Sequence, residues 1–323
     1  MKSGGITPNR PKSDSSESKI PIYSSYLLDF QPTISDHYIL FMKAPLFTIR
    51  FWGVRGSIPT PSPHTVKFGG NTACVEVRCG QDLIILDAGS GLRFLGNHLM
   101  NKEPIKANVL FSHLHWDHIQ GWPFFMPAYS PNNEFILRSH YRNGNSLKKI
   151  LSAQMSSPVF PVKLQEMKSK LIFRPFKNGE NFPIGNAKIQ TVPVKHPQKC
   201  TAFRIEFHNK VLLYATDIEH QKGKGIDSKI LKAAKDVDCL IYDATYTSNE
   251  YEGIGPQEVS KKGWGHSTWE EGIRLAKEGN VKQLVLFHHE PNRTDQELIT
   301  IEKKAQKQFP KTKAAKEGMI LHL

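Results

Sequence analysis

Short hydrophobic runs alternate with polar, glycine-rich turns along most of this chain. Runs of this length, rich in branched and aromatic residues, are typical of strands. They predict strands at residues 46–52, 72–79, 82–87, 107–111, 187–194, 201–207, 211–216, 240–243, 281–287 and 319–323, with one more between 134 and 174. Helical patterns fall at residues 90–100, 147–154, 164–170, 228–235, 268–278 and 295–308. Two successive β-rich halves with helices predict an α/β sandwich of two sheets covered by helices.

The first 45 residues differ from the rest. Residues 1–20 are rich in serine, proline and lysine, a composition typical of disorder. Residues 21–45 contain aromatic side chains but no clear element. We therefore expect a partly disordered extension at 1–45 and one domain at 46–323.

Composition narrows the class of protein. The net charge of +13 favours an anionic substrate. The late lysines, such as Lys303 and Lys307, are expected to form a solvated helix face. Four scattered cysteines predict reduced, buried thiols and no thiolate metal site. With no secretory signal pattern and no apolar run long enough to span a bilayer, we expect a cytoplasmic protein without a membrane segment.

The segment 113–118 carries the strongest chemical signal. His113, His115, Asp117 and His118 directly follow the buried strand 107–111. Histidines two apart on an extended backbone point the same way, so His113 and His115 can bind one ion. Asp117 and His118 come one turn later and can face a second ion. Four metal-type ligands at this spacing rarely occur by chance.

Further candidate ligands stand at the ends of later strands. His196 follows 187–194, Asp217 follows 211–216 and His288 follows 281–287. The predicted ligand sets are His113, His115, His196 and Asp217 for one ion, and Asp117, His118, Asp217 and His288 for the other. Asp217 is the predicted bridge because a carboxylate has two oxygens. This set suits two Zn²⁺ per chain, with Mn²⁺ or Fe²⁺ as alternatives.

This arrangement, His113-x-His115-x-Asp117-His118 followed by His196, Asp217 and His288, resembles the metallo-β-lactamase superfamily. The resemblance implies a four-layer αββα sandwich and a binuclear site, and it favours His288 over the adjacent His289. The segments Arg55–Pro59, Gly69–Thr72 and Asp87–Gly91 resemble the tRNase Z and phosphodiesterase branch. In that branch the aspartate at position 87 supports the metal ligands from outside.

Gly265-His266-Ser267-Thr268 resembles the histidine loop of the tRNase Z branch. Ser267 and Thr268 are good caps for the helix expected at 268, and a helix start favours an anion such as phosphate. His266 would then assist the departing oxygen. The resemblance gives Asp243 the role of orienting His266, and gives Asp117 the role of orienting or deprotonating the attacking water.

These features predict a metal-dependent phosphodiesterase that hydrolyses a small anionic phosphodiester, with a cyclic nucleotide preferred. A tRNase Z-like endoribonuclease is the alternative. It is less favoured because segment 141–170 is too apolar for a basic tRNA-binding arm, so nucleic acid is the less favoured partner. The resemblance also leads us to expect a homodimer. Arg55 and Asn71 are candidates for phosphate contact or for shaping their loops, and Glu219 and His220 for supporting the ligands from outside or for a polar loop. The aromatic residues Trp116, Trp122, Phe124 and Phe125 are candidates for a base-binding pocket, although core packing is the expected use of most of them.

Overall fold

The computed structural model describes residues 47–102, 104–140, 144–177, 179–220, 225–256 and 259–323. The chain divides into two units, Met1–Lys43 and Ala44–Leu323, and the described residues all belong to the second. The predicted extension at 1–45 lies outside the described residues and stays a prediction.

The first half of the described chain builds one sheet with its helices. Its strands are β1 (Phe47–Gly53), β2 (Cys74–Cys79), β3 (Asp82–Leu86), β4 (Lys106–Leu110), β5 (Glu134–Arg138) and β6 (Lys170–Phe173). Its helices are α2 (Leu92–Leu99) and α3 (Gly144–Gln154), with short 3₁₀ turns η1 (Trp116–His118), η2 (Trp122–Phe124), η3 (Met126–Tyr129) and η4 (Leu164–Glu166).

The second half repeats this plan with a second sheet. Its strands are β7 (Asn181–Ile184), β8 (Ala187–Val194), β9 (Cys200–Phe207), β10 (Lys210–Ala215), β11 (Cys239–Asp243), β12 (Leu284–Phe287) and β13 (Thr312–Ala314). Its helices are α4 (Ser228–Ala234), α5 (Ser248–Glu252), α6 (Trp269–Glu278) and α7 (Asp295–Gln308). The last strand, β14 (Ile320–His322), returns to the first sheet beside β1.

The strand order is β14-β1-β2-β3-β4-β5-β6 in one sheet and β13-β12-β11-β10-β9-β8-β7 in the other. Strands β3 to β6 are parallel, and so are β10 to β13. Because parallel strands end at the same edge, residues that follow β4, β10, β11 and β12 can meet at one rim.

Alternation along the strands produces the layers. On β3, Ile84 packs between the sheets, while its neighbour Ile85 packs against the helices. On β10, Leu212 faces the other sheet and Leu213 faces the helices. Successive strand residues point to opposite faces, so each sheet is apolar on both sides. Three apolar layers between four layers of structure confirm the predicted αββα sandwich.

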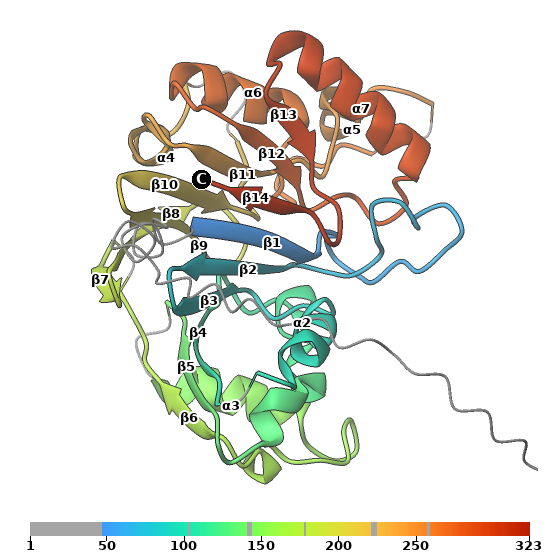
Figure 1. Cartoon of the computed structure of the whole chain (residues 1–323). Coiled ribbons are helices and arrows are strands. Elements are labelled where there is room, and N and C mark those ends of the chain that lie inside the picture. Colours follow the sequence, from blue (N-terminus) through green and yellow to red (C-terminus); the bar gives the residue numbers. More distant parts are fainter. Residues whose placement is uncertain (1–46, 103, 141–143, 178, 221–224, 257–258) are drawn as a thin grey trace, which may run out of the picture. The chain divides into compact units, whose positions relative to one another are not determined.

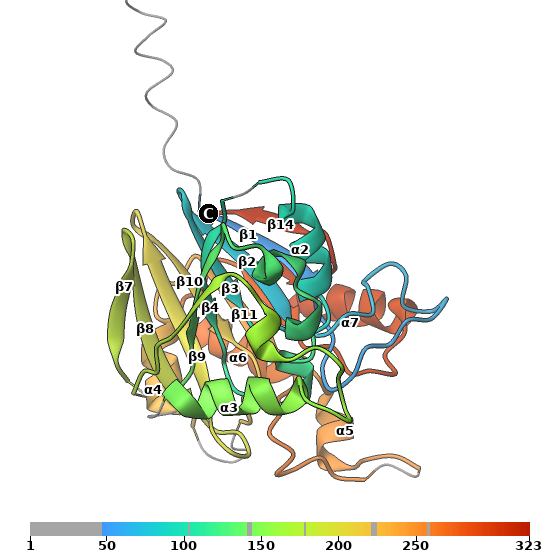
Figure 2. The ribbon, with the colours of Figure 1, turned by 90° about the horizontal axis from the view of Figure 1, so that it is seen from below.

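The helices cover the two outer faces. Figure 1 shows α4, α6 and α7 over the second sheet and α2 and α3 over the first. Turned by 90°, Figure 2 shows α2 and α3 in front of the first sheet. Among the described helices, none combines the length and apolar character needed to cross a membrane. All four cysteines are buried and unpaired, as predicted.

One predicted helix is wrong. Residues 164–170 form only the short turn η4, after which β6 begins at Lys170. The reason is tertiary hydrogen bonding: the Ser169 amide donates to Ala128 O at 3.1 Å, and the Lys170 amide donates to Asn133 O at 2.9 Å. These bonds draw the backbone into the sheet and override local helix propensity.

Candidate active site

The predicted site residues meet at the rim where the parallel strands end. His113 to His118 follow β4 and continue into η1, while Asp217 follows β10. Asp243 ends β11, and His288 comes directly after β12. The fixed ends of neighbouring strands therefore hold residues from distant parts of the sequence at one place.

Three of these turns use an unusual backbone conformation. Asp87, Asp217 and His288 have φ values of 61°, 52° and 59°. Left-handed φ in a residue other than glycine costs on the order of 1–3 kcal/mol and persists where the surrounding fold enforces it. Each strained residue stands just past a strand end, where the chain turns sharply. Two predicted ligands, Asp217 and His288, and the supporting Asp87 are therefore held in a strained backbone conformation by the fold around them.

Asp217 lies between two groups of histidines. Its Oδ1 is 3.7 Å from His113 Nε2 and 3.9 Å from His196 Nε2. Its Oδ2 is 3.2 Å from His118 Nε2 and 3.4 Å from His288 Nε2. The side chain is fully buried. The two oxygens of this one carboxylate therefore lie near the histidines of both predicted ligand sets, as a bridging ligand requires.

The remaining ligands complete each group. His115 Nδ1 lies 3.2 Å from His196 Nε2, and the rings of His113 and His115 are 4.3 Å apart. In the second group, Asp117 Oδ2 is 3.3 Å from the Nε2 atoms of both His118 and His288.

Each histidine presents one ring nitrogen to the cluster and the other to an outer partner. The outer contacts are His113 Nδ1 with Ser112 Oγ (3.1 Å), His115 Nε2 with Gln198 Oε1 (2.5 Å), His118 Nδ1 with Asp87 Oδ2 (2.9 Å), His196 Nδ1 with Gly265 O (2.7 Å) and His288 Nδ1 with Thr245 Oγ1 (3.2 Å). Such outer partners fix the ring and its tautomer in metal sites.

The inward-facing atoms fit a metal ion. His113 Nε2 is buried and has no hydrogen-bond partner. His118 Nε2 and His288 Nε2 are only 3.3 Å apart, although both face the same two carboxylates. Nitrogen and oxygen donors converging without thiolates suit Zn²⁺, Mn²⁺ or Fe²⁺. The residues present therefore fit a divalent metal centre.

The charges of the cluster are strongly coupled. Burial raises the pKa of Asp217, but the facing histidines outweigh burial and hold that pKa well below its usual value. Asp117 behaves in the same way, with His118 as its strongest neighbour. Burial lowers the pKa of His113 well below its ordinary value, which favours the neutral imidazole that a metal requires.

His266 and Asp243 form a separate pair beside this cluster. His266 Nδ1 donates to Asp243 Oδ2 at 2.8 Å. The ring stacks on His288, with centroids 4.9 Å apart and planes inclined by 20°. Burial lowers the pKa of His266, but the Asp243 carboxylate outweighs burial and raises it to about 9. With Nδ1 held by Asp243, Nε2 is the atom that can meet a substrate.

Asp87 supports the cluster from within the sandwich. Besides facing His118, it accepts hydrogen bonds from the Ser112 amide at 2.7 Å, from Ser112 Oγ at 2.8 Å and from Tyr214 OH at 2.8 Å. Asp87 is fully buried. It links β3, β4 and β10 at the point where the ligands leave the strands.

Some softer candidates have structural roles. Arg55 is fully buried and donates to Gly69 O at 2.8 Å and to Arg293 O at 2.6 Å, so of the two roles considered for it the structure shows the shaping of its loop. Asn71 donates from Nδ2 to Glu317 Oε2 at 3.1 Å. His289 turns away from the cluster, with Nε2 donating to Ala315 O at 2.8 Å.

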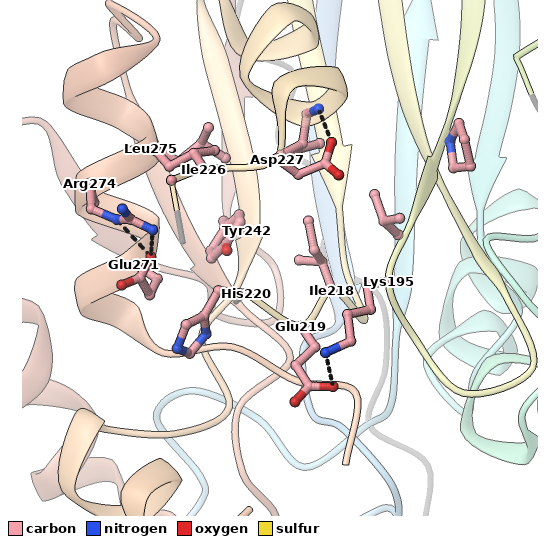
Figure 3. Close-up of a pocket in the computed structure, with 14 residues that line it drawn as sticks. Lys195, Ile218, Glu219, His220, Ile226, Asp227, Tyr242, Glu271, Arg274 and Leu275 are labelled. Atoms are coloured by element: carbon pink, nitrogen blue, oxygen red, sulfur yellow. Dashed lines mark hydrogen bonds and ion pairs between the residues drawn. The ribbon is translucent and has the colours of Figure 1, made fainter. Parts of the chain in front are cut away.

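Glu219 and His220 lie beside a cavity of about 90 Å³ behind the site. Figure 3 shows it between α4, α6 and the ends of the second sheet. Glu219 accepts from the Gly263 amide, and His220 contacts Ser267 Oγ at 3.0 Å. Both residues therefore brace the loop that carries His266.

Of the aromatic candidates, Trp122 and Phe125 are fully buried in the core under α2, so they do not form a substrate pocket. Trp116 and Phe124 are exposed. Ser57, Gln198 and Thr245 were not predicted. The Ser57 amide donates to Asp117 Oδ2 at 2.7 Å, and the other two residues support the histidines described above.

Comparison with known proteins agrees with this geometry. A family model described as "Beta-lactamase superfamily domain" matches residues 83–289. Ribonuclease Z of Sulfurisphaera tokodaii is 26% identical over 298 residues, covering 83% of this chain and 95% of that protein.

Two solved structures share the fold. The metallo-β-lactamase fold protein YhfI from Bacillus subtilis has a TM-score of 0.64 at 18% identity, covering 87% of this chain and 100% of its own. The short form of human tRNase Z has a TM-score of 0.58 at 17% identity, and the match covers 85% of this chain and 98% of that protein.

The chain therefore belongs to the β-lactamase superfamily, and the curated relatives it resembles include Ribonuclease Z proteins. The predicted class of enzyme, a metal-dependent hydrolase of phosphodiester bonds, is confirmed.

Proposed function

We propose that this chain is an RNA-cleaving phosphodiesterase of the Ribonuclease Z kind that uses two zinc ions. The pairing of His266 with Asp243 beside the metal cluster carries this proposal, because phosphodiester cleavage needs a proton for the leaving oxygen. Relatives named Ribonuclease Z, aligned over nearly their whole length, favour RNA over the cyclic nucleotide that the sequence put first.

The proposed assignment gives each residue a task. His113, His115, His196 and Asp217 hold one ion, and Asp117, His118, Asp217 and His288 hold the other. When bound, such ions draw charge from the phosphoryl oxygens and make water a stronger nucleophile at neutral pH. Asp117, with its depressed pKa and its Oδ2 fixed by the Ser57 amide, orients the attacking water by accepting its hydrogen bond.

His266 then delivers a proton to the departing oxygen. The Asp243 carboxylate raises the pKa of His266, which favours the protonated ring that can donate from Nε2. Asp243 keeps Nδ1 facing away from the substrate and stabilises the positive ring. Asp243 is itself fixed by the Thr245 amide at 3.1 Å and by Thr245 Oγ1 at 2.8 Å. His266 is thus a proton donor in this proposal, and Asp243 positions it.

Hydrolysis of a small cyclic nucleotide is the second candidate. Leu147, Leu151 and Met155 of the segment after β5 are buried against the first sheet. In its described part this segment forms a packed layer, which is unlike a protruding RNA-binding arm. A cytoplasmic location and a homodimer remain predictions.

A substrate panel separates the two candidates. Purified protein loaded with zinc or manganese is offered a precursor tRNA, 3′,5′- and 2′,3′-cyclic nucleotides, and bis-p-nitrophenyl phosphate. We expect the precursor tRNA to be cleaved with the highest kcat/KM. Exclusive hydrolysis of a cyclic nucleotide would establish the second candidate, and a metal-loaded protein inert towards all four would overturn both.

A further inference from the structure

The exposed tryptophans are found only beside the candidate active site. The chain has five tryptophans, all among the described residues. Trp52, Trp122 and Trp269 are buried, whereas Trp116 is 64% exposed and Trp264 is 53% exposed. A large exposed aromatic side chain forgoes the stabilisation of burial, so a pair of them at one place points to a binding role.

Both exposed residues, here called the rim tryptophans, are tied to the site through the backbone. Trp116 lies between His115 and Asp117 in η1. Trp264 precedes Gly265, whose carbonyl oxygen accepts from His196 Nδ1 at 2.7 Å. Because His196 lies against His115, the backbone positions of the two tryptophans adjoin one histidine pair, one from each half of the sandwich.

The surroundings of the rim tryptophans are cationic. Lys261 Nζ lies 4.6 Å above the Trp264 ring. Lys199, on the loop that carries His196, is exposed, and so are Lys195 and Lys262, which pair with Glu219 Oε2 at 3.5 Å and with Glu252 Oε2 at 2.7 Å. Aromatic faces between lysines are the combination that binds single-stranded nucleic acid, because bases stack on the rings while cations meet the phosphates. A buried apolar partner surface would lack these charges.

We propose that the rim tryptophans stack on unpaired bases next to the scissile phosphate, so that the substrate enters as a single strand. This inference rests on the proposed function and specifies its substrate class. It makes Trp116 and Trp264 specificity-determining residues that act on binding, while the ligands and His266 act on the phosphate.

Binding measurements test this directly. The probe is a fluorescent, phosphorothioate-linked, single-stranded RNA oligonucleotide, compared with one of equal length whose nucleotides are abasic. Base stacking contributes roughly 1–3 kcal/mol per base, so Trp116→Ala and Trp264→Ala should each raise Kd for the base-bearing probe about tenfold. Neither change should alter Kd for the abasic probe, and Trp→Phe at either position should retain most of the affinity.

Phe94→Ala is the matched control, because Phe94 is an aromatic side chain that is 42% exposed on α2, a helix that carries none of the candidate site residues. It should leave both dissociation constants unchanged. Equal binding of the base-bearing probe by wild type and both Trp→Ala variants would overturn the inference, as would an equal loss for the abasic probe.

The same experiment separates the inference from the proposed function. If wild type cleaves RNA but the tryptophan variants bind normally, the stacking inference fails and the proposed function stands. If the tryptophans bind the base-bearing probe but metal-loaded wild type cleaves no RNA, the proposed function fails and the binding surface stands.

Discussion

His266 Nδ1 donates a 2.8 Å hydrogen bond to the buried carboxylate of Asp243. The pair stands beside the metal cluster, with the His266 ring stacked on His288. A histidine held in this way is available as a proton donor, and the hydrogen bond to Asp243 can hold its orientation when the neighbouring residues bind metal ions. Metal binding and proton transfer are therefore assigned to different residues.

The first prediction concerns this separation. His266→Ala should lower kcat by roughly a hundredfold or more, as expected for loss of a general acid, while metal content stays at the wild-type level. Asp243→Asn should lower kcat in the same direction, because its amide cannot stabilise the positive ring. Turnover and metal analysis on the same samples check both. Loss of metal from His266→Ala would mean that His266 is a ligand.

The second prediction concerns Asp87, which contacts His118 from the side opposite the cluster. Asp87→Ala should weaken metal affinity by roughly ten- to a hundredfold, a typical effect of losing an outer partner. Metal titration followed by activity measures the effect, and saturating metal should restore part of the turnover. Unchanged metal affinity would show that Asp87 serves only to join the strands.

The third prediction uses the close approach of the backbone to His288. A Cβ added at Gly56 would stand 2.3 Å from His288 Cε1, a clash that displaces the ring or the loop. Gly56→Ala should therefore reduce metal content and kcat. The matched control is Gly225→Ala, where an added Cβ has no neighbour within 4 Å. Equal metal content in the two variants would contradict the predicted role of His288.

The fourth prediction lies away from the site, at Asp238. This carboxylate accepts from the Val211 amide at 2.8 Å, from Lys282 at 2.8 Å and from Lys210 at 3.3 Å. Burial raises the pKa of Asp238, but these donors, led by Lys282, outweigh burial and lower the pKa below its ordinary value.

A folded-state pKa below the unfolded one stabilises the protein above the unfolded pKa and loses that effect as pH falls. Asp238→Asn should therefore reduce the free energy of unfolding at pH 7, by about 0.5–1 kcal/mol because both lysine partners are solvent-exposed. The difference from wild type should shrink below about pH 4, near the unfolded pKa. Urea unfolding at a series of pH values measures it, and a difference that grows on acidification would have the wrong sign.

The sequence identified the site because its residues stand at strand ends. The buried runs before His118, Asp217 and His288 have the strand pattern, and parallel strands bring their ends together. The roles of Asp87 and Asp243 came from the family resemblance, and the structure adds the contacts through which each acts.

Other features depend on contacts that no local pattern encodes. Ser57 meets Asp117, and Gln198 meets His115, only after the chain has folded. The strand β13 is a three-residue segment without an apolar run, and it exists because it pairs with β12. The 3₁₀ turn at 164–166 likewise reflects hydrogen bonds to distant residues and lies outside the reach of helix propensity.

The most direct measurement counts metal ions and phosphodiester turnover in wild type and Asp217→Asn together. Among the described residues, Asp217 is the one whose two carboxylate oxygens lie near both groups of histidines. We predict two ions per wild-type chain with turnover of a phosphodiester, and loss of metal with loss of turnover in the variant. A wild-type chain that binds no divalent metal, or an Asp217→Asn variant with full metal content and full activity, would contradict this prediction.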